Sequence, residues 1–131
     1  MKLRVLLILS SVLLAVVGAG ILLTPVAFHA SSGIVLEPDA SLLSEVRAPG
    51  GALLALSPLV AVGALRPRWA ETSTLLGAVV FLAYGSSRLI GIALDGVPAQ
   101  SLVVACAIEL LLGFACLVAL ARRRGVVRLA G

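Results

Sequence analysis

The chain has 131 residues, of which 61% are hydrophobic and only 12% are charged. This balance lies far outside the range of soluble domains, so it excludes an ordinary soluble enzyme or binding module. The formal net charge of +4 would suggest a nucleic-acid or acidic partner in a soluble protein, but most of the basic residues lie in the loops and termini that flank the apolar segments. The composition therefore predicts an integral membrane protein with membrane lipid, and no nucleic acid, as its partner.

Four apolar segments are long enough, or nearly so, to cross a bilayer. A transmembrane helix needs about 20 mostly apolar residues to cross a hydrocarbon core of about 30 Å. The predicted spans are 5–28, 42–65, 74–94 and 101–121. Short connections make consecutive spans antiparallel neighbours. We therefore predict an all-α, four-helix membrane bundle with up-down-up-down topology, forming a single transmembrane domain over residues 1–131.

The first span has an alternative interpretation as a cleaved signal peptide. Lys2 and Arg4 precede an apolar run that ends in the sequence AFHASS, which is the charge order of a signal peptide. The apolar region of a signal peptide is usually about 7 to 15 residues long, and this run is longer. Retention as the first membrane helix is therefore the favoured interpretation.

The loop charges predict the orientation. Basic residues lie before the first span, between the second and third, and after the fourth: Lys2, Arg4, Arg66, Arg68, Arg122, Arg123, Arg124 and Arg128. The other two connections contain no Lys or Arg, and their acidic residues are Glu37, Asp39 and Asp95. The positive-inside rule then places both termini and the middle loop in the cytoplasm, with the chain in the cell inner (plasma) membrane. The basic C-terminal run is expected to anchor this topology and to contact anionic lipid.

Four ionisable residues within the spans are not explained by topology: Glu45, Arg47, Arg88 and Glu109. At 1.5 Å of rise per residue, all four lie about 5 to 12 Å below the outer boundary, in one layer. We predict a buried polar cluster in the outer half of the bundle, in which Arg88 pairs with Glu109, and Arg47 with Glu109 or Glu45. Tyr84 and Asp95, on the helix of Arg88, are the further predicted members.

Small residues share helical faces with these charges, which suggests where the faces point. Residues three or four positions apart lie on one face of a helix, and small residues let helices approach closely in lipid. The glycines predicted to lie at close helix contacts are Gly50, Gly51, Gly85, Gly91 and Gly113. The charges on these faces are then expected to point into the bundle, where they either fix helix packing or form a ligand site. Snorkelling of the arginines to the headgroups is a third interpretation.

The start of the second span has two interpretations. Glu45 and Arg47 project about 200° apart on one helix and cannot easily pair while both are helical. If Pro49 instead occupies a first helical turn, the helix begins near Ala48 and the two charged residues can approach one another. That alternative leaves only about 17 residues up to Leu65, which is short for a span.

No catalytic, metal-binding or cofactor motif is recognisable in the sequence. His29 lies at a predicted interface without a nearby nucleophile, and the APGGA sequence lacks the lysine of a phosphate-binding loop. Cys106 and Cys116 lie ten residues apart on one predicted helix, beyond disulfide reach. The sequence therefore gives no support for an enzyme and predicts no metal site and no cofactor.

Three segments, LLSEVRAPGGALLAL, RPRW and RLIGIALDGVPA, carry a family resemblance. The chain resembles the bacterial family of small membrane proteins called domain of unknown function 4345, from about the first helix to Leu120. The resemblance implies a four-helix membrane bundle and a set of recurrent positions, but no reaction. Two function classes stay open: a membrane protein that binds a small ligand or lipid through its polar layer, and a structural or accessory subunit. The second class implies a homo-oligomer or a larger membrane complex.

Overall fold

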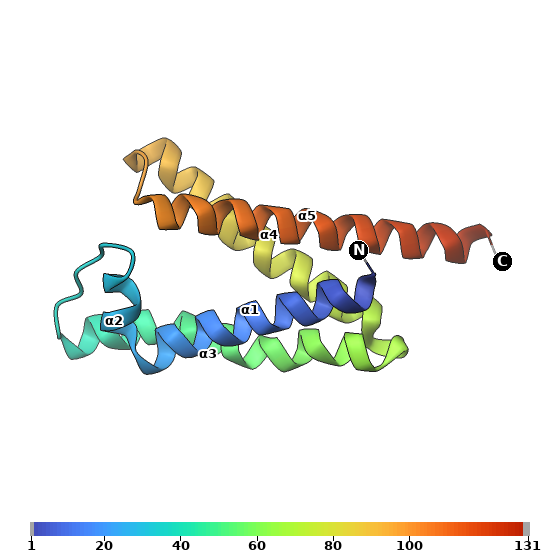
Figure 1. Ribbon diagram of the computed structural model, residues 1–131, viewed down its shortest axis with the longest axis horizontal. Coiled ribbons are helices and arrows are strands. Elements are labelled where there is room, and N and C mark those ends of the chain that lie inside the picture. The colour runs from blue at the N-terminus through green and yellow to red at the C-terminus, as the bar shows by residue number, and fades with distance from the viewer. Residues whose placement is uncertain (1, 130–131) are drawn as a thin grey trace.

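The computed structural model describes residues 2–129, and the side chains of residues 2–123. The described residues form four long helices and two short ones, joined by loops, and contain no strand (Figure 1). In chain order they are α1 (Leu3–Leu23), α2 (Pro25–Ala30), α3 (Ala40–Leu65), the 3-10 turn η1 (Pro67–Trp69), α4 (Ala70–Asp95) and α5 (Gln100–Leu129). The all-α prediction is confirmed. The side chains of Arg124 and Arg128, in the predicted anchor, lie outside the described side chains.

The long helices form two hairpins. The most extensive packing joins α1 to α3 and α4 to α5, while α3 and α4 make a smaller interface next to the turn that connects them. Figure 1 shows the two hairpins separating from this turn toward the end of the molecule that holds α2. The hairpins are thus splayed at one end.

The first long helix ends earlier than predicted because of Thr24 and Pro25. Pro25 has no N–H to donate to a carbonyl of α1, and it occupies the first position of α2, where a proline is tolerated. The backbone N–H and the hydroxyl of Thr24 both donate to the carbonyl of Gly20, at 3.0 and 3.1 Å. The predicted span to residue 28 is therefore divided into α1, which ends at Leu23, and the separate short helix α2.

Helix α3 begins earlier than predicted. Its N-cap is Asp39, whose carboxylate accepts a hydrogen bond from the backbone N–H of Leu42 at 2.9 Å. Pro49 consequently lies in the helix interior, and the alternative start near Ala48 is wrong. The Asp39 carboxylate provides an acceptor for a backbone N–H group of the first helical turn. The helix therefore begins at Ala40, well before Pro49, and Pro49 does not start it.

A second proline, Pro58, also lies inside α3. A proline at this position cannot donate to the carbonyl of Leu54, four residues earlier. The hydroxyl of Ser57 donates to that carbonyl instead, at 2.9 Å. Ser57 therefore supplies the hydrogen bond that Pro58 removes.

The turn between α3 and α4 is tightly packed. The hydroxyl of Ser73 on α4 donates to the carbonyl of Leu59 on α3 at 2.6 Å. A Cβ atom on Gly63 would lie 3.1 Å from the Cα atom of Ala70, so only glycine fits here without a shift of the backbone. At the far end of α4, Gly96 adopts a positive φ of 96° and ends the helix. The beginning of α4 is thus packed against α3, and Gly96 ends the helix at the other side.

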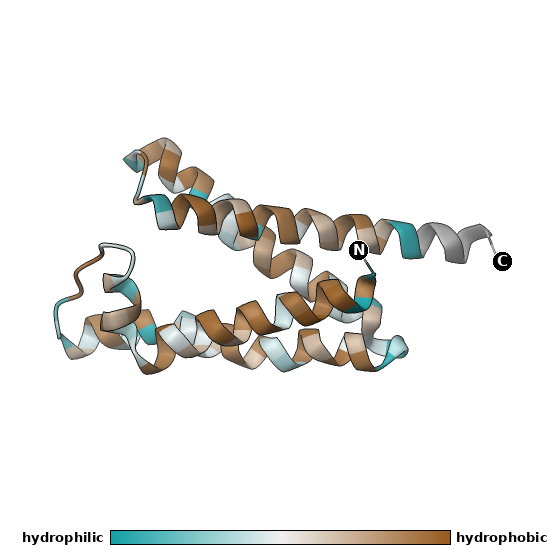
Figure 2. Ribbon diagram, in the orientation of Figure 1, coloured by the Kyte–Doolittle hydropathy of each residue, from teal (hydrophilic) through white to brown (hydrophobic). Residues whose placement is uncertain are grey.

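The protein buries a thin apolar core and leaves most of its apolar surface exposed. One core cluster joins residues of α1, α3 and α4, and its buried members are Leu7, Leu14, Leu53, Val60 and Phe81. Large apolar side chains point outward, among them Val16 at 63% and Leu111 at 71% exposure. Figure 2 shows hydrophobic residues on all four long helices, and each of these helices is long and apolar enough to cross a membrane. The exposed apolar surface is that of a protein surrounded by lipid.

Candidate functional site: a cleft between the hairpins

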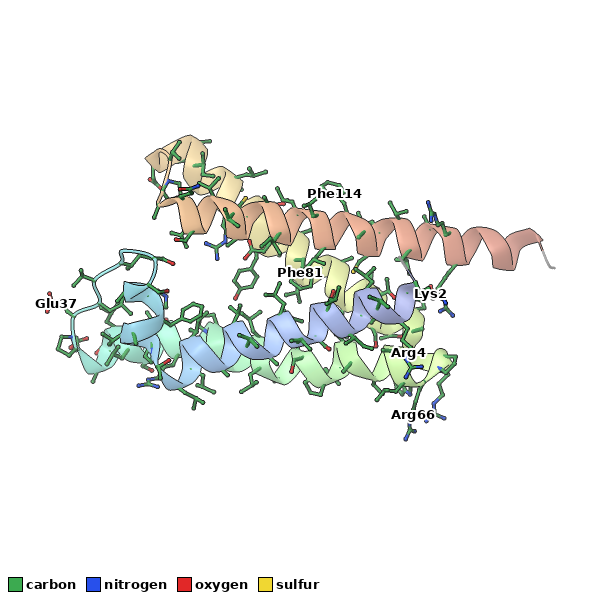
Figure 3. All side chains as sticks on the ribbon, in the orientation of Figure 1. Lys2, Arg4, Glu37, Arg66, Phe81 and Phe114 are labelled. Carbon is green, nitrogen blue, oxygen red and sulfur yellow. The ribbon has the colours of Figure 1, made fainter. Side chains whose placement is uncertain are left out.

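A cleft with a volume of ≈ 280 Å³ lies where the two hairpins separate. All four long helices line it, together with α2 and the loop that follows α2. Its walls are mostly aliphatic and aromatic, for example Val17 of α1, Leu53 of α3, Phe81 of α4 and Ala105 of α5. Figure 3 shows Phe81 on the side of α4 that faces α1, whereas Phe114 is 58% exposed on α5.

The polar residues in the lining are few. They are His29 and Ser32 from α2 and its following turn, Tyr84 and Arg88 from α4, and Ser101 and Glu109 from α5. Apolar walls with a small number of polar groups are typical of sites for small molecules.

The central polar contact is an ion pair between α4 and α5. Arg88 Nε lies 2.9 Å from Oε2 and 3.2 Å from Oε1 of Glu109. The side chain of Arg88 is 33% exposed and that of Glu109 only 14%. The sequence predicted this pairing, and the structure brings the two residues together. Their opposite charges make the pair neutral, and both residues belong to the lining of a mostly apolar cleft.

Tyr84 lies on the same side of α4 as Arg88, one helical turn away, and its half-buried side chain lines the cleft. Its hydroxyl makes no hydrogen bond to another residue in the described part of the chain. A buried or half-buried phenol usually finds a partner. The Tyr84 hydroxyl is therefore available to a molecule in the cleft.

His29 also lines the cleft, which the sequence analysis missed. Its Nδ1 atom lies 2.8 Å from the carbonyl oxygen of Pro25, and its ring packs edge-on against Phe28. The sequence placed His29 at an interface because it follows an apolar span. Only the break at Thr24 and Pro25, which ends α1 and begins the separate helix α2, could have indicated its position at the cleft.

The other predicted cluster members lie elsewhere. Arg47 donates from Nη1 to the backbone carbonyl of Leu22, so it joins α3 to α1. Glu45 is exposed, and no hydrogen bond or ion pair between described residues connects it or Arg47 to Glu109. Asp95 is exposed at the end of α4. The described chain thus contains an Arg88–Glu109 pair and a separate Arg47 contact in place of the predicted four-charge cluster.

The predicted glycines fall into two groups. A Cβ atom on Gly50 would lie 2.7 Å from the backbone nitrogen of Leu22, and one on Gly85 or Gly113 would lie 2.7 Å from a leucine side chain of the partner helix. At Gly51 and Gly91 a Cβ atom would meet nothing closer than 4.0 Å. Gly18, which was not predicted, lies at a still closer contact, because a Cβ atom there would lie 2.5 Å from the backbone nitrogen of Leu54.

Both cysteines are buried and free. The Sγ atom of Cys106 lies 3.5 Å from the carbonyl oxygen of Gly85, and Cys116 has no exposed surface. Among the described side chains, no three His, Cys, Asp or Glu residues are grouped as metal ligands would be. The cysteines therefore act as small packing residues at the contact between α4 and α5.

An all-helical chain with four long apolar helices and a cleft between them defines a small multi-pass membrane protein. Comparison with known protein families identifies the family: the family described as domain of unknown function (DUF4345) matches residues 2–120. The chain belongs to this family, as its sequence motifs predicted. No curated protein and no solved structure matches the chain.

Proposed function

We propose that the protein binds an amphipathic small molecule or lipid in the cleft between its hairpins. The observation that carries this proposal is the cleft itself, whose mostly apolar lining also contains the Arg88–Glu109 pair. A hydrocarbon chain fits against the walls, and a polar head group fits beside Arg88, Glu109 and Tyr84. Ionisable residues inside a membrane are costly, and a ligand contact is a common reason for their presence.

The orientation in the membrane is part of the same proposal. Figure 3 shows Lys2, Arg4 and Arg66 toward one end of the molecule and Glu37 at the other end. The positive-inside rule supports a cytoplasmic position for the basic end, an up-down-up-down passage of the four helices, and cytoplasmic termini. The cleft then opens in the outer half of the bilayer of the plasma membrane.

The volume of the cleft limits the size of the ligand. A volume of ≈ 280 Å³ lies near the lower end of the range of about 300–1,000 Å³ that is typical of small-molecule sites. The cleft thus accommodates a hydrocarbon segment of medium length or one part of a longer chain.

Ligand-dependent thermal stability tests the proposal. Because Cys106 and Cys116 are buried and free, a thiol-reactive fluorogenic dye reports unfolding of the protein in lipid nanodiscs. A ligand that binds only the folded state raises the unfolding midpoint. The probe is monododecanoylglycerol, a neutral amphiphile with a 12-carbon chain, added at a fixed mole fraction of the nanodisc lipid.

Two alanines of α5 provide a matched pair of variants. Ala105 lines the cleft, whereas Ala107 is exposed on the same helix and is not part of the lining. We expect Ala105→Phe to fill the cleft and abolish the probe-dependent rise, and Ala107→Phe to leave it unchanged. An equal response of the wild-type protein and both variants would refute binding in the cleft and favour the structural or accessory-subunit function.

A further inference from the structure

We propose that the head group recognised in the cleft is uncharged and both donates and accepts hydrogen bonds, as the glycerol ester of a monoacylglycerol does. This inference rests on the proposed binding function and specifies its ligand class. It follows from the hydrogen-bonding groups that the Arg88–Glu109 pair leaves unused and from the neutrality of that pair.

Arg88 has spare donors. A guanidinium carries five N–H groups, and Arg88 uses only the one on Nε to reach Glu109. Its two terminal nitrogens make no hydrogen bond to another described residue. Since the side chain is one-third exposed and lines the cleft, these N–H groups are available to an acceptor oxygen on a ligand.

Glu109 has spare acceptor capacity. Both of its oxygens accept from the same Arg88 nitrogen, and a carboxylate has about four lone-pair sites in total. A ligand hydroxyl can therefore donate to Glu109 while a ligand carbonyl accepts from Arg88. The unpartnered hydroxyl of Tyr84, which can do both, adds a third contact in the same lining.

A head group with a net charge fits this site poorly. A carboxylate that approaches Arg88 also approaches Glu109, and a quaternary ammonium that approaches Glu109 also approaches Arg88. In a site of low polarity the repulsion is poorly screened, and the charged head loses its hydration as well. A zwitterionic head loses the hydration of two charges, while the charges it would meet are already paired with each other. The neutral pair thus selects for a neutral ligand partly by excluding charged ones.

Four probes that share a 12-carbon chain test this preference in the nanodisc assay. They are monododecanoylglycerol, dodecanoate, dodecyltrimethylammonium and dodecylphosphocholine, each at the same low mole fraction. We expect monododecanoylglycerol to bind the wild-type protein at least tenfold more tightly than each of the others. Tighter binding of any charged or zwitterionic probe would overturn the inference, whereas no cleft-dependent response to any probe would overturn the binding function itself.

Substitution of either Arg88 or Glu109 alone is then expected to change the order of affinity for the four probes in a defined direction. Glu109→Gln leaves the positive charge of Arg88 unbalanced, so we expect dodecanoate to gain at least tenfold relative to monododecanoylglycerol. Arg88→Gln leaves Glu109 unbalanced and is expected to favour dodecyltrimethylammonium by a similar factor. Glu45→Gln, which removes an exposed carboxylate outside the cleft, is the control and leaves the order unchanged.

The double variant Arg88→Gln/Glu109→Gln separates recognition from folding. It restores a neutral site, so it keeps the preference for monododecanoylglycerol even if a single variant is too unstable to assay. Its amide groups still donate and accept hydrogen bonds. A double variant that prefers dodecanoate or dodecyltrimethylammonium, or a single variant that folds and retains the wild-type order, would contradict the inference.

Discussion

Arg47 of α3 donates a hydrogen bond to the backbone carbonyl of Leu22, in the last turn of α1. The last carbonyls of a helix have no intrahelical donors, and the break at Thr24 leaves these carbonyls within the apolar part of the chain. The positive charge of Arg47 also lies favourably at the negative end of the α1 dipole. One half-buried arginine thus supplies a donor to a carbonyl in the last turn of α1 and joins α1 to α3.

The first prediction concerns this contact. We expect Arg47→Met, which keeps the length of the side chain but removes its donors, to lower the free energy of unfolding by about 1–3 kcal/mol. Glu45→Gln, two residues earlier and exposed, should change it by less than about 0.5 kcal/mol. The shift of the unfolding midpoint, followed with the thiol-reactive dye, compares the stability of the two variants. Equal stabilities of the two variants would show that the Arg47 bond contributes nothing.

Substitution of two adjacent glycines by alanine is expected to change the stability in opposite directions. A Cβ atom on Gly50 would lie 2.7 Å from the Leu22 backbone nitrogen and 2.8 Å from the Cβ atom of Ile21. We therefore expect Gly50→Ala to push α1 and α3 apart and to cost about 1–3 kcal/mol of stability. At Gly51 the space is open to 4.0 Å, so Gly51→Ala should instead gain about 0.5–1 kcal/mol through its higher helix propensity. A stabilising Gly50→Ala would be incompatible with this close contact between α1 and α3.

The Ser57–Pro58 pair allows a test by double substitution. Ser57→Ala leaves the Leu54 carbonyl without a donor and should lower the free energy of unfolding by about 1 kcal/mol. In a Pro58→Ala background, the backbone N–H of residue 58 can donate to Leu54 in the ordinary helical manner. The same Ser57→Ala change should then have little effect. Unfolding midpoints of the four proteins give the coupling, and additive effects would argue against the replacement of the helical bond by Ser57.

The sequence was sufficient to predict the helical class and the pairing of Arg88 with Glu109. Hydropathy over about 20 residues is a strong local signal, and two opposite charges at similar depth have few other partners in lipid. The destination of Arg47 was not predictable in this way. It depends on a backbone carbonyl, which every residue has, and on a helix end that is visible only once α1 and α3 are packed together.

The cleft illustrates a second limit of sequence patterns. Val17, Ala105 and other wall residues are as apolar as the lipid-facing residues beside them, so hydropathy does not distinguish a wall from a lipid contact. The difference between Gly50 and Gly51 has the same origin. Both are small, and only the rotation of α3 relative to α1 decides which of them meets the other helix.

The last prediction tests the proposed orientation. Val35 lies in the loop before α3 and is 85% exposed, and Arg68 is exposed in the turn before α4. Because the two native cysteines are buried, Val35→Cys and Arg68→Cys can each be labelled against the wild-type background. A membrane-impermeant maleimide added to intact cells should label Val35→Cys at once, and Arg68→Cys only after the membrane is permeabilised. The reverse order would invert the topology and place the cleft in the inner half of the bilayer, and labelling of the wild-type protein would show that a native cysteine is accessible.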